Sequence, residues 1–216
     1  QTHPGQDEEA VLALRRLAAE FLSDVDCHVV VYTYMGVYPK TPGGATALLR
    51  EAARLAVRTG AARLIVKTTA EAHRIPTIAE NVAALEAAAA AARECRAASE
   101  EPEDTGIYAE ARALVEAVLD LGPDVGRALT EAFGRGYLDV PFCLHPDNAG
   151  RSRSHLDAHG RLCWSRTGAM PVRPDPAPGR AELSAAALLT SLSYVERKFD
   201  DAALEGCLTG TGPTAR

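Results

Sequence analysis

The sequence CHVVVYTY at residues 27–34 decides the fold, because it is β-branched and aromatic and does not alternate between apolar and polar positions. Such a run is typical of a parallel strand that is buried on both faces. A helix over residues 45–58, ended by Gly60, separates it from a second run of this kind, RLIVK at residues 63–67. Strand, helix and strand in this order predict a parallel pair joined by a right-handed crossover.

Helices are expected on both sides of this unit. Asp7 can cap an amphipathic helix that runs to Phe21. A long helix is expected from about Thr77 to Ala98, because Thr77 and Glu80 have the spacing of a capping box. The alternation of strands and helices therefore continues into the second third of the chain.

The composition changes after an acidic break at residues 99–104, and residues 136–178 are rich in Gly, Pro, Asp and Arg. We expect a C-terminal part with only short strands and a disordered end. The elements predicted there are helices at 108–121, 125–133 and 182–199, strands at 136–142 and 161–165, and a tail within residues 201–216 that is disordered from Gly206 onward.

Two strand and helix units followed by an irregular module fit an α/β fold of one of two kinds. They match the last two β/α units of a (β/α)8 TIM barrel with an irregular α+β C-terminal extension, or equally a piece of a doubly wound sheet. The corresponding division is a barrel part at residues 1–100, an extension module at 101–200 and a tail at 201–216.

The charge and hydropathy of the chain exclude some classes of partner. The 216 residues carry a formal charge of −6, and the Lys and Arg residues are scattered, so neither a nucleic acid nor an anionic membrane is an expected partner. The longest apolar stretch, residues 83–92, is far shorter than the roughly 20 residues of a membrane span. We expect no membrane-spanning helix.

The cysteines and histidines give no metal signature. The five cysteines are widely spaced, no CxxC pair or secretory leader is present, and the six histidines form no HxH or HExxH motif. These observations predict free thiols in a reducing cytoplasm and no metal site. The cysteines are Cys27, Cys95, Cys143, Cys163 and Cys207.

The first candidates for chemistry are the residues that follow the two predicted strands, because ligands bind at the carboxyl ends of strands in α/β sheets. Lys67 ends the second strand, where a charge is costly unless it is paired or faces a pocket, and Glu71 is its nearest acidic neighbour in sequence. The two can hold a polyol such as a ribose, or they form a plain ion pair at the rim. Met35, after the first strand, is a candidate site residue or, as is more usual for methionine at a strand end, a core filler.

Three phrases, in order and sensibly spaced between Val25 and Gly160, resemble the large (epsilon) subunit of glutamate mutase, also called methylaspartate mutase. The first is YTYMGVYP at residues 32–39, where the family has an aromatic residue before Met-Gly-Val-Phe-Pro. The second combines IVKT (65–68), EA (71–72) and IPT (75–77) and closes at Asn81, and the third combines AF (132–133), Gly136, DVPF (139–142), Asn148 and Gly150.

The resemblance covers the C-terminal half of that subunit and implies a function. The family uses adenosylcobalamin to interconvert L-glutamate and (2S,3S)-3-methylaspartate by a radical carbon-skeleton rearrangement. Lys67 and Glu71 fall on positions that bind the adenosyl ribose, and Met35 falls on a wall of the active site. The arginines that grip the substrate and the catalytic residues of the family lie on early barrel strands, which have no counterpart in this chain.

The resemblance also implies partners. The cobalt of the coenzyme is held in this family by a small cobalamin-binding subunit with an Asp-x-His-x-x-Gly motif, and neither residues 26–31 nor 157–162 have its glycine. A heterotetramer with that small subunit is therefore expected. The chain is interpreted as an incomplete mutase subunit, and the alternatives are another adenosylcobalamin mutase or a non-catalytic remnant or scaffold. Tyr32, His145 and Leu156 depart from the family's usual His, Ser and Arg.

Overall fold

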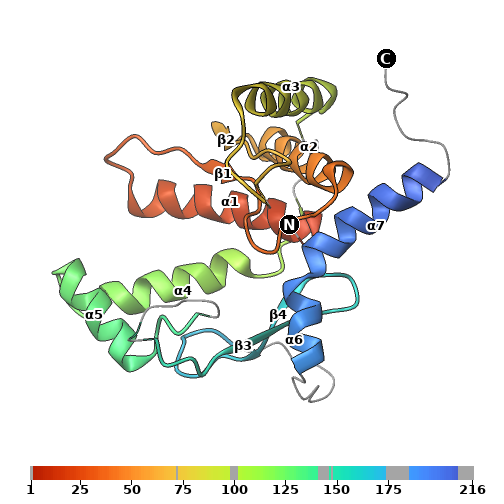
Figure 1. Ribbon diagram of the computed structural model, residues 1–216. Helices are drawn as coiled ribbons and strands as arrows, with labels where there is room; N and C mark the ends of the chain where they lie inside the picture. Colours follow the sequence, from red (N-terminus) through yellow and green to blue (C-terminus); the bar gives the residue numbers. More distant parts are fainter. Residues whose placement is uncertain are drawn as a thin grey trace.

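A parallel pair of strands lies at the centre of the fold (Figure 1). The computed structural model describes residues 2–71, 73–97, 102–140, 146, 148–173 and 185–208. In it β1 (Val30–Tyr32) pairs in parallel with β2 (Arg63–Ile65). The predicted parallel pair is therefore confirmed, although both strands are shorter than the sequence indicated.

Helices α1 (Pro4–Phe21) and α2 (Pro42–Thr59) cover one face of this sheet, where Val31 is buried. On the opposite face Val30 and Tyr32 are 40% and 55% exposed. The prediction of strands buried on both faces is thus wrong for this chain, because the described residues leave the opposite face open.

Both covering helices begin earlier than predicted, at a proline in the first helical turn. The ring nitrogen Nδ1 of His3 caps α1 by accepting the amide of Gln6 at 3.2 Å, so Asp7 lies inside the first turn and is not the cap. The hydroxyl of Thr41 caps α2 by accepting the amide of Gly44 at 3.0 Å. In both helices, a polar capping residue followed by proline therefore determines where the helix begins.

Two helix boundaries were predicted correctly, because a local sequence signal marks each of them. Gly60 ends α2 in the left-handed conformation, with φ of 64°. Helix α3 (Ile78–Glu94) starts with the predicted capping box, in which Thr77 and Glu80 bond reciprocally. Helix α3 ends at Glu94, earlier than the predicted Ala98.

The capping box predicts a dependence of α3 on acid pH. The guanidinium of Arg74 bonds both carboxylate oxygens of Glu80, and this pair and the Thr77 amide lower the pKa of Glu80 from 4.5 to about 2. A carboxyl whose pKa is lowered on folding stabilises the fold above its unfolded value, and this contribution disappears as pH falls through its folded value. The first turn of α3 should therefore loosen between pH 4.5 and about 2.

This expectation is checked by following the Glu80 carboxyl carbon and the first-turn amides of α3 by NMR during an acid titration. A Glu80→Gln variant has no carboxyl to titrate at this position, so its first turn should not change over this pH range. Titration of Glu80 at its ordinary value of 4.5 would contradict the expectation.

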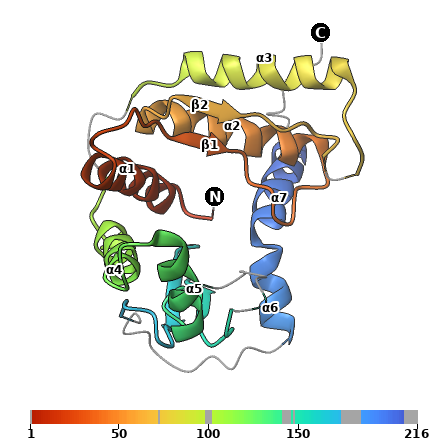
Figure 2. The ribbon, with the colours of Figure 1, turned by 90° about the vertical axis from the view of Figure 1, so that its left-hand side faces the viewer.

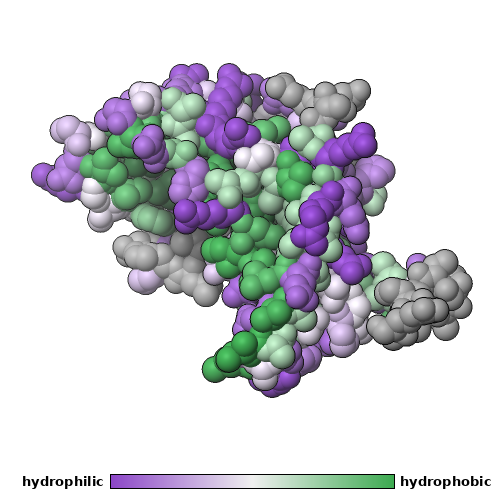
Figure 3. All heavy atoms as spheres, turned by 90° about the horizontal axis from the view of Figure 1, so that it is seen from above, coloured by the Kyte–Doolittle hydropathy of each residue, from purple (hydrophilic) through white to green (hydrophobic). Residues whose placement is uncertain are grey.

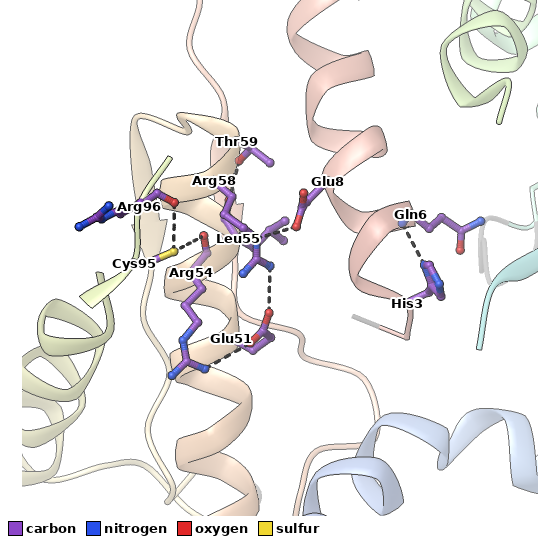
Figure 4. A network of polar contacts seen from close by, with 10 residues as sticks. All are labelled: His3, Gln6, Glu8, Glu51, Arg54, Leu55, Arg58, Thr59, Cys95 and Arg96. Atoms are coloured by element: carbon purple, nitrogen blue, oxygen red, sulfur yellow. Dashed lines mark hydrogen bonds and ion pairs between the residues drawn. The ribbon is translucent and has the colours of Figure 1, made fainter. Parts of the chain in front are cut away.

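A charged network fastens α1 to α2 on the side away from the open face (Figure 4). Arg58 of α2 reaches Glu8 of α1 with Nε at 2.5 Å and Glu51 of its own helix with Nη2 at 2.9 Å. Arg54 approaches Glu51 at 3.3 Å. Since Arg58 and its two partners are at most 28% exposed, the network is shielded in part and links the helices behind the sheet.

A second carboxylate joins α1 to the C-terminal part of the chain. Glu9 is 7% exposed and accepts the amide and the hydroxyl of Thr105, at 2.8 and 2.6 Å, and the amide of Ile107 at 3.1 Å. Ile107 starts α4 (Ile107–Leu119), so Glu9 fixes the start of α4 against α1. The C-terminal part also contains α5 (Val125–Arg135) and an antiparallel hairpin of β3 (Arg153–Leu156) and β4 (Leu162–Arg166).

Two expectations about this part were wrong. Residues 136–140 form turns rather than a strand, and residues 141–142 of that prediction lie outside the described residues. The turn is held by Asp139, whose buried carboxylate accepts backbone amides of residues 150–152. β3 was not predicted, because its sequence RSHL is mostly polar, whereas β4 confirms the predicted strand at 161–165.

The helix predicted at 182–199 is divided into α6 (Ala185–Leu192) and α7 (Tyr194–Leu208). Residues 182–184 lie outside the described residues, and so does the predicted disordered tail from residue 209 onward. The part of that tail up to Leu208 is helical, which corrects the prediction. Figure 2 places α7 against α2, on the opposite side of the molecule from α1.

No closed barrel is present in the described part of the chain, whose two sheets have two strands each. The top of the molecule is α3 (Figure 1), where Ile78, Val82 and Leu85 recur at helical spacing and are 86%, 47% and 57% exposed. Seen from above, apolar and charged residues share the surface of the molecule (Figure 3). Among the helices that the structure describes, none combines the length and the apolar character that a membrane span requires.

Candidate ligand site at the carboxyl edge of the sheet

Two buried threonines shape the carboxyl edge of the sheet. Thr33, after β1, donates its amide and its hydroxyl to the carbonyl oxygen of Ile65, at 3.2 and 3.0 Å. Thr68, two residues after Val66, accepts the amide of Ala70 with its hydroxyl at 3.2 Å and turns the chain back. This turn returns the next residue, Glu71, to the end of β2.

Lys67 and Glu71 meet at this edge as the sequence predicted. The Lys67 Nζ lies 3.7 Å from Oε2 of Glu71, and the two side chains are 19% and 21% exposed. This distance is longer than a hydrogen bond, so the ammonium and the carboxylate keep donors and acceptors for a further group. The Lys67 Nζ also lies 5.5 Å from the centre of the Tyr32 ring.

Tyr38 brings a third polar group that sequence reasoning did not assign. The residue is only 8% exposed, and its hydroxyl has no hydrogen-bond partner among the described residues. Burial, with the negative charge of Glu71 as a second cause, raises the pKa of Tyr38 to about 12. The one available signal was a tyrosine in a phrase where the related family has phenylalanine. A buried hydroxyl without a partner is costly, which favours a ligand or a water there.

Met35 lies in the loop that joins β1 to Tyr38 and is 45% exposed. Met35 is therefore not part of the core that the described residues form. The next residue must be small, because a Cβ at Gly36 would overlap the hydroxyl of Tyr34. Among the described residues, no hydrogen bond or ion pair joins Met35 to Lys67 or Glu71. The role of Met35 as a wall of the active site therefore stays a prediction.

The residues that could hold a metal do not gather in the described part of the chain, where no group of three or more His, Cys, Asp or Glu side chains is close enough. Cys27 and Cys95 are free cysteines. The site at the carboxyl edge therefore consists of an ammonium, a carboxylate and a phenol, which together suit a ligand with several hydroxyl groups.

The sequence matches a known family over most of its length. Residues 1–182 match the family described as Methylaspartate mutase E chain. The glutamate mutase epsilon subunit of Escherichia coli O157:H7 is 33% identical over 184 residues, which are 79% of this chain and 38% of that protein. The subunits of the same name from Yersinia enterocolitica and Desulfitobacterium hafniense are 31% and 32% identical, over 79% and 73% of this chain. The chain spans 38% or less of the length of these three relatives.

Proposed function

Because this chain belongs to the methylaspartate mutase E chain family, we propose that it contributes the carboxyl edge of the last two strand and helix units to the barrel of a glutamate mutase large subunit. The observation that carries the proposal is the juxtaposition of Lys67, Glu71 and the unpartnered hydroxyl of Tyr38 at that edge. In α/β proteins this edge is where ligands bind.

The three groups fit the ribose of adenosylcobalamin. A ribose diol both donates and accepts, so one of its hydroxyls can donate to Glu71 and accept from Lys67, whose charged atoms lie 3.7 Å apart. When bound, the coenzyme supplies the radical chemistry of the isomerisation. The task of Lys67 and Glu71 is to bind and orient the ribose, with the unpartnered hydroxyl of Tyr38 as a further hydrogen-bonding group, and the side chain of Met35 excludes water beside it.

The rest of the enzyme would come from other segments. The open face of the sheet, with Val30, Tyr32 and Ile65 at 40%, 55% and 38% exposure, suits further barrel strands. Those strands would carry the groups that bind glutamate or 3-methylaspartate. A small cobalamin-binding subunit would hold the cobalt in a heterotetramer. If this chain assembles with both without turnover, it is a scaffold rather than part of an active enzyme.

The ribose assignment makes a prediction. Lys67→Ala and Glu71→Ala should each weaken the binding of adenosylcobalamin by roughly 1–3 kcal/mol, because each removes a charge-assisted hydrogen bond. The measurement is the dissociation constant of the coenzyme for this chain assembled with the remaining barrel segment and the small subunit. The same preparation is assayed for conversion of glutamate to 3-methylaspartate.

The chain offers a matched control pair. Glu131 and Arg135 form an ion pair at the same spacing of four residues, on the exposed surface of α5. Alanine at either position should leave the affinity unchanged. If Lys67→Ala and Glu71→Ala also leave it unchanged, the assignment of a ribose site is wrong and the pair only closes the rim.

A further inference from the structure

Helix α7 lies beyond residues 1–182, the part of the chain that matches the family, yet it contacts the loop that carries the candidate site. Figures 1 and 2 both place it beside the start of α2. This start follows the loop of Met35 and Tyr38 directly. The contacts of α7 therefore bear on the geometry of the site.

The central contact is made by Asp200 of α7. One carboxylate oxygen accepts the amide of Lys40 at 2.9 Å, and the other accepts the amide and the hydroxyl of Thr41, at 3.1 and 2.6 Å. An acidic group is stabilised at this place by the positive end of the α2 dipole. Lys40 also forms an ion pair with Glu196 of α7 at 2.6 Å.

Two glycines at the start of α2 permit this close approach. A Cβ at Gly43 would lie 3.1 Å from the Cβ of Ala203, and a Cβ at Gly44 would overlap the carboxylate of Asp200. Gly44 has an ordinary helical backbone, so its lack of a side chain serves the contact and not an unusual conformation. The sequence of α2 thus accommodates Asp200.

Beneath these polar contacts α7 holds Tyr38 itself. Val195 and Phe199 form one buried cluster with Tyr38, Ala45 and Leu48. The ring of Tyr38 is therefore enclosed by α2 and α7, while its hydroxyl is buried without a partner among the described residues. Without α7 most of this enclosure would be absent.

We propose that α7 is a positioning clamp for the site, in which Asp200 fixes residues 38–41 and so holds the Tyr38 hydroxyl in place for a ligand at the Lys67 and Glu71 pair. Asp200 is a positioning residue, because it acts through the loop and does not touch the ligand position. The identity of the ligand rests on the proposed function, but the clamp itself does not.

The test measures the enclosure of Tyr38 without any ligand. Tyrosines that are buried and protonated resist nitration by tetranitromethane, so the rate at Tyr38, located by tandem mass spectrometry, reports the clamp. In Asp200→Asn and Gly44→Ala this rate should rise about tenfold or more. In these variants the loop can open locally without first breaking the hydrogen bonds to the Asp200 carboxylate. Gly44→Ala displaces Asp200 without any change of charge, so an agreement of the two variants excludes a purely electrostatic effect.

Matched controls separate the clamp from general destabilisation. Asp201→Asn changes the same charge at the next, exposed position of α7, and Gly134→Ala adds a methyl to α5, where nothing lies within 4 Å of it. Both should nitrate Tyr38 at the wild-type rate. Circular dichroism confirms that each variant is folded. Wild-type rates in folded Asp200→Asn and Gly44→Ala would overturn the clamp.

A second measurement relates the clamp to function. In the assembled complex the two clamp variants should also bind adenosylcobalamin about tenfold more weakly, as expected for the loss of one positioned hydrogen bond. Faster nitration together with unchanged coenzyme affinity would support the clamp and count against the proposed ribose site. The two proposals thus fail in distinguishable ways.

Discussion

Replacing Asp139 with alanine is expected to lower the free energy of unfolding by about 4 kcal/mol, through the loss of the turn that follows α5. Asp139 is 2% exposed, and its carboxylate accepts the amides of Gly150 and Arg151 at 2.6 Å each and of Ser152 at 3.0 Å. Alanine would leave three amides without their acceptor, at least one of them buried. The hydroxyl of Ser152 also donates to the backbone carbonyl of Asp139, so the same turn would loosen on both sides.

The measurement is the free energy of unfolding in urea, together with amide hydrogen exchange over residues 136–156. Asp139→Asn keeps the shape but only one acceptor oxygen, so we expect roughly half of the loss. Asp120→Ala, at an exposed position, is the control and should have little effect. A loss below about 1 kcal/mol for Asp139→Ala would show that water replaces the carboxylate.

The second large effect is expected at Leu48, in the middle of α2. Leu48 is completely buried in the cluster with Tyr38 and Phe199. Leu48→Ala should lower the free energy of unfolding by about 2–5 kcal/mol, because it removes apolar contacts and leaves a cavity between α2 and α7. Urea unfolding monitored by circular dichroism measures this loss.

Leu14 of α1 offers a control with the same chemistry, because its side chain is 55% exposed. Leu14→Ala should change the free energy of unfolding by less than about 0.5 kcal/mol. Equal losses in the two variants would mean that α7 does not pack on α2 in solution.

The features that were predicted correctly from the sequence depend on neighbours in the chain. The capping box of Thr77 and Glu80, the end of α2 at Gly60 and the pairing of Lys67 with Glu71 each involve residues within five positions. Their physical causes are a helix cap, a left-handed turn and two nearby charges, and each cause lies within a short stretch of sequence. The same holds for the strand at β4.

The features that were missed depend on distant segments. Whether β1 is covered on one face or two is decided by elements far away in the chain, so the composition of residues 27–34 could not reveal it. Tyr38 is buried in a cluster to which α7 contributes Val195 and Phe199, more than 150 positions further along the chain. The turn at Asp139 requires amides 11 to 13 residues away, and a periodic pattern does not record such contacts.

The contact between Lys40 and Asp200 has a consequence for biosynthesis, because 160 residues separate its two partners. A ribosome releases β1, α2, β2 and α3 long before it has made α7, and the N-terminal parts of a chain fold first during synthesis. The sheet with its Lys67 and Glu71 pair can therefore form on the nascent chain, while Tyr38 stays uncovered until α7 emerges. The nascent chain therefore gains its enclosed edge only after α7 has been made.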